Sequence, residues 1–263
     1  MGLIVLLFSV VTFANPVLLG KLTQGSLIRG QIAPHSQVKL DGEALKVAPS
    51  GEFAFGFGRD ASLTHTLSWR LPNTTDWVSK TLTLTKRAYK LDNIEGVAQK
   101  YVSPPPEVLS RIRKDNQAIA AARRSFTDSV FFMQDFILPA QGRISGVYGS
   151  QRIFNSVPKR PHFGLDIANK TGSPVVAPAS GIVRLAHKDM YYSGGTLILD
   201  HGYGISSTFI HLSKIYVSEG QEINQGELIA EIGATGRVTG PHLDWRINWF
   251  KERLDPALLV DLP

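Results

Sequence analysis

Short segments in which apolar and polar residues alternate are the feature that most constrains the fold of this chain. A period of two is typical of strands with one buried face, and turn residues about every 8–12 positions are typical of a β-sandwich. We therefore predict a small β-sandwich over residues 15–88. The segments that carry this pattern are Ser26–Ile32, Gln37–Leu40, Phe53–Phe57, His65–Leu71 and Thr81–Thr85.

Asp41-Gly42 follows the second of these segments and predicts a type I′ hairpin turn. Every second residue of Phe53–Phe57 is phenylalanine, so the three rings are expected on one face of a strand. No group of catalytic or metal-ligating side chains stands out in this region, and His35 and His65 are isolated. The sandwich is therefore expected to be an accessory domain.

Residues 89–130 are interpreted as a linker that contains a helix after the proline run Pro104–Pro106. The helix is expected to begin at Glu107 and to connect the two β domains. Its apolar positions at helical spacing are Val108, Ile112, Ile119 and Phe126. The basic residues between them are Arg111, Lys114, Arg123 and Arg124. A solvated helix face is the favoured interpretation of these basic residues over contact with an acidic polymer.

Strand patterns return between residues 131 and 263, with no pattern of a long helix among them. These residues are predicted to form an antiparallel β domain, so the fold class is mainly β. The clearest strand segments are Ile182–Ala186, Thr196–Leu199, Ser206–Ile210, Glu227–Ile232 and Leu243–Trp249.

Composition excludes several kinds of site. The 263 residues include no cysteine, which rules out disulfides, thiol nucleophiles and cysteine-ligated zinc or iron–sulfur centres. The net charge of +6 favours an acidic partner such as nucleic acid, anionic lipid or an acidic polymer. Nucleic-acid binding ranks far below the other classes, because the basic residues are scattered and show no aromatic–basic strand pattern.

The first residues, Met1–Ala14, form an apolar run with the length of a signal-peptide core. A membrane-spanning helix needs about 20 apolar residues, so this run is too short to span. Thr12 and Ala14 supply small residues for cleavage after Ala14, although no basic residue precedes the run. A buried N-terminal strand is the alternative. We expect an exported protein, periplasmic or secreted, without a stable membrane anchor.

Histidine and aspartate recur in three clusters of the C-terminal region. His242 and Asp244 are two residues apart, so on a strand they share one face. His162 and Asp166 are four apart, and Gly164 between them favours a loop that enters a strand. Imidazole and carboxylate groups are suitable zinc ligands, and a catalytic zinc site leaves a position open for water. His211, the centre of the third cluster, taken alone is more often a structural histidine.

These clusters lie within a longer stretch of sequence that resembles the lysostaphin-type (LytM-like) zinc metallopeptidases, which cut peptide bonds in bacterial peptidoglycan. The resemblance covers roughly residues 137–260. The matching segments are Gly142–Gly149, His162–Ala168, Gly172–Ala179, Ser180–Val183, Leu199–Gly204, His211–Ser213, Val217–Gln221, Gln225-Gly226 and Gly233–His242.

The resemblance implies roles at matching positions. His162 and Asp166 match two zinc ligands of the family, and His211 and His242 match its two catalytic histidines. It also implies hydrolysis of peptidoglycan peptides by a metal-activated water. The family's third zinc ligand is the second histidine of a His–x–His pair, and this chain has Asp244 there.

Two interpretations of Asp244 compete. In the favoured one, Asp244 is the third ligand, since its carboxylate oxygen is as many bonds from Cα as a histidine Nδ1. A site with two carboxylates would also tolerate a harder metal such as Mn²⁺. In the other, the site is degenerate, and the protein is a regulator of other cell-wall hydrolases or a peptidoglycan-binding scaffold.

Other polar residues near these clusters have two interpretations each. Tyr191 and Tyr192 could line a substrate groove or belong to a surface loop. Arg237 and Arg246 could meet peptide carboxylates or form ordinary ion pairs. His201 is interpreted as a structural histidine.

Overall fold

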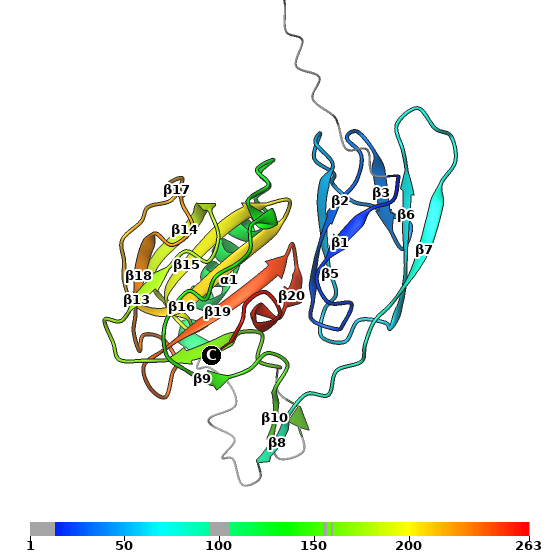
Figure 1. Cartoon of the computed structure of the whole chain (residues 1–263). Coiled ribbons are helices and arrows are strands. Elements are labelled where there is room, and N and C mark those ends of the chain that lie inside the picture. The colour runs from blue at the N-terminus through cyan, green and yellow to red at the C-terminus, as the bar shows by residue number, and fades with distance from the viewer. Residues whose placement is uncertain (1–13, 95–105, 155–156, 159, 263) are drawn as a thin grey trace, which may run out of the picture.

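The structure is a computed structural model, and it describes residues 14–94, 106–154, 157–158 and 160–262. It is mainly β, as predicted. Two strand-rich bodies lie side by side, and one long helix flanks the C-terminal body (Figure 1). The predicted signal-peptide core lies outside the described residues, apart from Ala14. None of the helices in the described part is long and apolar enough to cross a membrane.

The N-terminal body is a sandwich of two antiparallel sheets with strand orders β1-β2-β5 and β4-β3-β6-β7. Its core contains the three phenylalanines of the predicted strand, all 2% exposed or less. Asp41 and Gly42 both have positive φ, at 51° and 86°, so the predicted type I′ turn is present. The strands are β1 (Val17–Leu19), β2 (Leu27–Gln31), β3 (Gln37–Leu40), β4 (Glu43–Ala44), β5 (Glu52–Gly56), β6 (Thr64–Arg70) and β7 (Val78–Thr83).

The C-terminal body is built on an antiparallel sheet with the strand order β17-β14-β15-β16-β19-β12-β9, to which β18, β13 and β20 are added at the sides. One face of this sheet packs into the main core, where Trp245 and Phe209 are fully buried. Its strands are β9 (Arg143–Gly146), β12 (Leu165–Ala168), β13 (Pro174–Val176), β14 (Gly181–Met190), β15 (Gly194–Gly202), β16 (Ile205–Ile215), β17 (Glu222–Ile223), β18 (Leu228–Ile232), β19 (His242–Trp249) and β20 (Glu252–Leu254).

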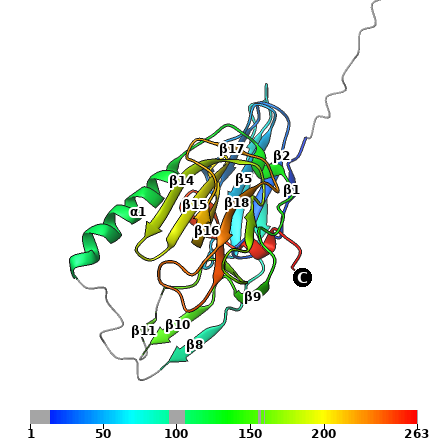
Figure 2. The same ribbon diagram turned by 90° about the vertical axis from the view of Figure 1, so that its left-hand side faces the viewer.

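The helix α1 (Leu109–Arg124) lies along the C-terminal sheet, as the turned view shows (Figure 2). Ala122 and Ile119 pack against Ile198 on β15. The helix that was expected to connect the two β domains therefore also covers part of the second face of the C-terminal sheet. Within the described residues there are also three short 3₁₀ helices: η2 (Pro106–Val108), η3 (Phe131–Met133) and η4 (Pro256–Leu258).

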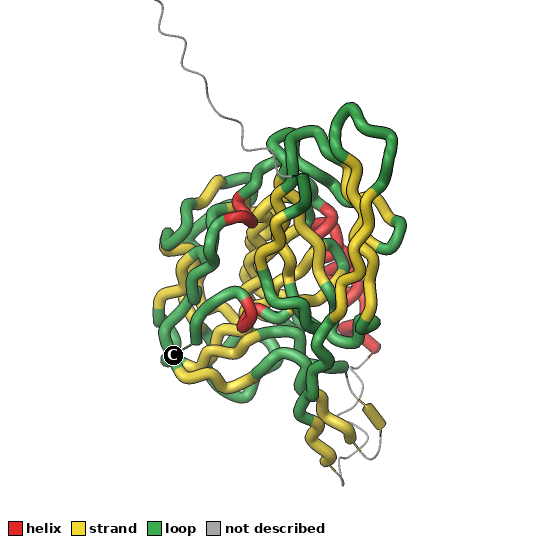
Figure 3. Tube along the Cα trace, turned by 45° about the vertical axis from the view of Figure 1, so that its right-hand side comes forward, coloured by secondary structure: helices red, strands yellow, loops and turns green. Residues whose placement is uncertain are grey.

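A small sheet extends away from the two bodies, and the pattern of alternating residues did not predict it (Figure 3). In this sheet β8 (Leu91–Ile94) runs parallel to β10 (Gln151–Phe154), which pairs with β11 (Val157–Pro158). Each strand has at most four residues, so period-two alternation is too short to be recognised. The sheet joins the end of the sandwich to the chain that leads to His162.

The two bodies are packed against each other through buried contacts. Arg87 forms an ion pair at 2.7 Å with Asp255, which is 2% exposed. Arg29 on β2 donates to the carbonyl oxygens of Met133 and Gln134. Trp249 packs against the cores of both bodies. The sandwich is therefore fixed against the β19–β20 side of the C-terminal sheet.

Candidate metal centre

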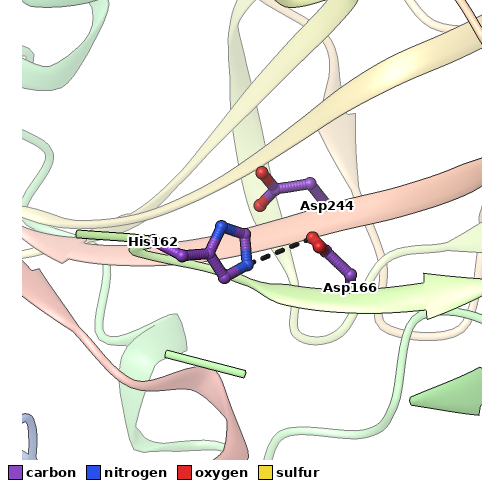
Figure 4. A group of neighbouring side chains, drawn as sticks. All are labelled: His162, Asp166 and Asp244. Carbon is purple, nitrogen blue, oxygen red and sulfur yellow. Dashed lines mark ion pairs between the residues drawn. The ribbon is translucent and has the colours of Figure 1, made fainter. Parts of the chain in front are cut away.

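Two side chains from neighbouring strands and one from the loop before β12 converge at one point of the sheet (Figure 4). Asp166 on β12 lies directly opposite Asp244 on β19 in the antiparallel register, so both carboxylates lie on the same face. His162 lies in the loop before β12, as the sequence predicted from Gly164. One ligand atom from each of the three residues lies within 4.8 Å of the others.

Two atoms of this group have fewer partners than buried polar atoms normally have. Nε2 of His162 and Oδ1 of Asp166 form an ion pair at 3.2 Å. Both are buried, and neither makes a hydrogen bond with any other described residue. Unpartnered buried polar atoms are rare because each carries a desolvation cost. A divalent cation held between the imidazole and the carboxylates would satisfy both atoms, so the residues present fit a zinc site.

Two glycines make room for the carboxylates. A Cβ added to Gly146 on β9 would collide with Oδ2 of Asp166, and one added to Gly164 would collide with Oδ1 of Asp244. Neither glycine has a positive φ, so the close approach of the carboxylates, rather than backbone conformation, requires glycine here. The backbone is thus shaped around the two acidic groups.

Asp244 is held by Arg246, which follows it on the same face of β19. Arg246 donates to both carboxylate oxygens, at 2.9 and 2.5 Å. Burial raises the pKa of Asp244, but the charge and hydrogen bonds of Arg246 outweigh burial and lower it. Asp244 is therefore ionised at neutral pH, as a metal ligand must be.

Two further histidines lie beside the three-residue group. The rings of His211 and His242 are 4.9 Å apart between centroids, and Nε2 of His242 is 4.0 Å from Oδ1 of Asp166. His211 has a φ of 69°, a conformation that is uncommon outside glycine and recurs at functional sites. The backbone N–H of His211 donates to Ser193. All five residues implied by the family resemblance are thus brought together.

Hydrogen bonds fix the tautomers of these two histidines. Nδ1 of His211 lies 2.9 Å from the carbonyl oxygen of Thr235, and Nδ1 of His242 lies 2.9 Å from that of Gly240. A carbonyl can only accept, so Nδ1 of each ring carries a proton, and Nε2 is the ring nitrogen left to act toward the site.

The pKa values of two histidines of the site, His211 and His162, are shifted in opposite directions. Burial lowers the pKa of His211, and the weaker effects of the Thr235 carbonyl and of Asp244 do not reverse this. Burial alone would also lower the pKa of His162, but the adjacent carboxylates of Asp166 and Asp244 outweigh it and raise that pKa. His211 is therefore neutral at physiological pH and able to accept a proton.

Other residues considered in the sequence have structural partners. His201 is fully buried between Ser180 and Ser207, in agreement with a structural role. Arg237 stacks 4.4 Å over the Tyr192 ring, so these two side chains pair with each other. Arg246 forms an ion pair with Asp244. An ordinary ion pair was one of the two interpretations given for this arginine, and contact with a peptide carboxylate was the other. The proximity of Arg123, on α1, to this region was missed, because helix spacing alone placed it among solvated basic residues.

Comparison with known proteins places this geometry in a family. Residues 160–256 match Peptidase family M23. A stretch of 116 residues is 36% identical to the peptidoglycan DD-endopeptidase ShyA of Vibrio cholerae and covers 43% of this chain and 26% of ShyA. Another, of 130 residues, is 38% identical to an uncharacterized metalloprotease of Haemophilus influenzae and covers 48% of this chain and 26% of that protein.

The fold extends the comparison beyond the matched stretch. A crystal structure assigned to peptidase M23 from Pseudomonas aeruginosa aligns with a TM-score of 0.69 at 27% identity, covering 91% of this chain and 95% of that one. The matched stretches span about a quarter of the length of the two curated relatives, 26% in each case. The resemblance inferred from the motifs is confirmed for residues 160–256, the part of the chain that matches Peptidase family M23.

Proposed function

We propose that the protein is a zinc-dependent endopeptidase that hydrolyses peptide bonds in bacterial peptidoglycan. The observation that carries the proposal is the convergence of His162, Asp166 and Asp244 around two buried atoms that lack hydrogen bonds. The name of the Vibrio cholerae relative, a peptidoglycan DD-endopeptidase, supports peptidoglycan as the substrate. The net charge of +6 is compatible with an acidic wall polymer.

The residues divide into ligands and proton-transfer groups. His162, Asp166 and Asp244 would hold the zinc ion, which supplies a Lewis acid for the scissile carbonyl and lowers the pKa of water. Nε2 of His211 is the general base, because Nδ1 of that ring is committed to Thr235 and burial keeps the ring neutral. His242 faces the same space, and its ring, when protonated at both nitrogens, would donate from Nε2 to the negative charge that develops on the carbonyl oxygen.

Four of the five family residues are retained and the fifth is replaced by another competent ligand, which argues for an active enzyme over a degenerate regulator. Asp244 is 2% exposed, and its register opposite Asp166 places a carboxylate where a ligand is needed. The glycine at position 164 leaves space for this carboxylate. A site that had lost its metal would have no need to keep a buried negative charge beside a second carboxylate. The regulator remains the second candidate function, on the single ground that aspartate replaces the family histidine.

Export is part of the proposal. Met1–Ala14 would act as the signal peptide, with cleavage after Ala14. The mature protein would then begin at the sandwich of residues 15–88, followed by the linker and helix of 89–130 and the peptidase domain of 131–263. Its partners would be peptidoglycan peptides, and other cell-wall hydrolases if the regulator reading holds.

The test is digestion of purified peptidoglycan by the zinc-loaded full chain, with mass spectrometry of the products. The proposal predicts that cross-linked muropeptides are converted to monomers, and that a chelator stops the conversion. The variant His162→Ala should be folded and inactive, because the metal loses its imidazole ligand. Full activity of His162→Ala would contradict the proposal. A folded wild-type protein that cleaves no wall type but stimulates a separate hydrolase would favour the regulator.

A further inference from the structure

Four arginines gather on the face of the sheet that carries the candidate metal centre. Arg246 on β19 is paired with Asp244, and its cross-strand neighbour Thr208 on β16 accepts a hydrogen bond at 3.0 Å from Arg123. Arg253 on β20 and Arg160 both lie 5.8 Å from the Phe163 ring, which is adjacent to His162 in sequence. The cluster thus connects α1, β19, β20 and the loop before β12.

The positive charge of this cluster is not balanced. Asp244 is the acidic partner of Arg246, but neither Arg123 nor Arg253 forms an ion pair with a described residue. Burial, together with the charges of Arg246 and Arg160, lowers the pKa of Arg253 to about 10. Arginine remains protonated under these conditions. Partly buried like charges of this kind are costly unless an anion joins them.

Three polar atoms beneath the arginines also lack partners. On the sheet, Asn248 lies between Ser206 of β16 and Arg253 of β20 in register. Asn248 is fully buried and Ser206 is 4% exposed. Oδ1 of Asn248, Oγ of Ser206 and Nε of Arg123 are buried, and none of them has a hydrogen-bond partner among the described residues. The surroundings of the arginines are therefore polar and incompletely satisfied.

The strand geometry places this cluster within a few residues of the candidate metal centre. Asp244 and Asn248 are four residues apart on β19 with their side chains on one face. Four residues of a strand span about 13 Å, which is the length of about four residues of an extended peptide. A peptide held at the metal centre and running along β19 would reach the arginines within a few residues.

We propose that Arg123 and Arg253, with Arg160 at the exposed edge, form a subsite for a carboxylate of the peptide substrate. The planar guanidinium group presents paired N–H donors that match a carboxylate. The subsite rests on the proposed function for the identity of its ligand, since a stem peptide of peptidoglycan carries carboxylates as well as amides.

The test compares two ligands on metal-free protein. One is a purified cross-linked muropeptide dimer, and the other is the same dimer after amidation of its carboxylates. Chelation prevents a carboxylate from binding through a metal and prevents hydrolysis, so calorimetry reports binding alone. The subsite predicts that the full wild-type chain binds the free dimer at least tenfold more tightly than the amidated dimer. Equal affinities would overturn it, and this comparison needs no variant.

Variants assign the preference to the arginines. Arg253→Gln and Arg123→Gln should each reduce the preference for the free dimer severalfold or more and leave the affinity for the amidated dimer unchanged. The matched control is Arg124→Gln, because Arg124 is exposed and adjacent to Arg123. It should retain the wild-type preference. Equal weakening of both dimers by Arg253→Gln and Arg123→Gln would contradict the subsite.

The outcomes for the subsite and for the proposed function are separable. A carboxylate preference in metal-free protein, together with no cleavage by the zinc-loaded protein, would contradict the proposed catalysis and leave the subsite intact. Cleavage by the zinc-loaded protein without any carboxylate preference in the metal-free protein would contradict the subsite and leave the proposed catalysis intact.

Discussion

Asp244 and Arg246 lie two residues apart on β19 and form a bidentate ion pair, with N–O distances of 2.9 and 2.5 Å. The pair has two consequences for the metal centre. It keeps the Asp244 carboxylate ionised in a buried position, and it fixes the direction of the carboxylate relative to Asp166. Groups that orient metal ligands in this way commonly affect metal affinity tenfold or more. Arg246 is therefore expected to act on the metal through Asp244.

The first prediction concerns the variant Arg246→Met. Removing one partner of a buried ion pair typically costs about 3–5 kcal/mol, because the other charge is left uncompensated. In metal-free protein the free energy of unfolding should fall by about that amount. In zinc-loaded protein the loss should be smaller, since the cation also balances Asp244. Urea unfolding with and without zinc measures both values, and equal losses in the two states would show that no metal contacts Asp244.

The second prediction separates the two interpretations of Asp244. The variant Asp244→Asn keeps the size of the side chain and removes its charge, so zinc affinity should fall at least tenfold. Competition with a chromophoric chelator measures this affinity. Asp189→Asn is the matched control, because Asp189 is exposed and pairs with Arg111 away from the site. Unchanged zinc affinity of Asp244→Asn would support the degenerate site.

The third prediction tests the space around the Asp244 carboxylate. In Gly164→Ala the added methyl group would collide with Oδ1 of Asp244, so the carboxylate must move and zinc affinity should fall. Gly240→Ala is the control, since nothing lies within 4 Å of a Cβ built at Gly240. Zinc titration of both variants checks this. Equal zinc affinities of the two variants would contradict the inference that the space at Gly164 lets the Asp244 carboxylate bind zinc.

The fourth prediction assigns His211 to proton transfer and not to metal binding. A general base typically contributes about 10²- to 10⁴-fold to the rate. His211→Ala should therefore lose activity on peptidoglycan by a factor in that range and still bind one zinc ion per chain. Metal analysis and amine release on the same sample test this. Loss of zinc together with activity would place His211 among the ligands.

The fifth prediction concerns acid stability. Burial lowers the pKa of His201 to about 4, against an ordinary value of 6.5. The unfolded chain therefore binds more protons between these values, and stability is lost as the pH falls through this window. Between pH 7 and pH 5 the contribution of this histidine to the free energy of unfolding should fall by about 2 kcal/mol. His201→Gln should show a correspondingly smaller loss in urea unfolding, and an identical loss would contradict the assignment.

The sequence predicted the strands well where they are long and where one face is buried. The Gln37–Leu40 segment and its Asp41-Gly42 turn are present as expected. β8 was missed because it has four residues and pairs in parallel with the distant β10. Such a strand is determined by a partner about sixty positions away along the chain, which local alternation does not reveal.

The candidate site followed from the sequence as a set of residues but not as a network of contacts. Strand periodicity placed His242 and Asp244 on one face, and the family resemblance added His162, Asp166 and His211. The pairing of Arg246 with Asp244 was one open alternative. The position of Arg123 near Arg246 depends on how the end of α1 packs over β16, and nothing in the sequence of the helix determines that packing.

The most direct test of the account is free-amine release from purified peptidoglycan by the full chain loaded with one equivalent of zinc, measured before and after chelation. The account predicts release that stops on chelation and returns when zinc is added back. No release from any wall type by a folded, zinc-loaded protein would contradict the central claim that His162, Asp166 and Asp244 form the metal centre of a peptidoglycan endopeptidase.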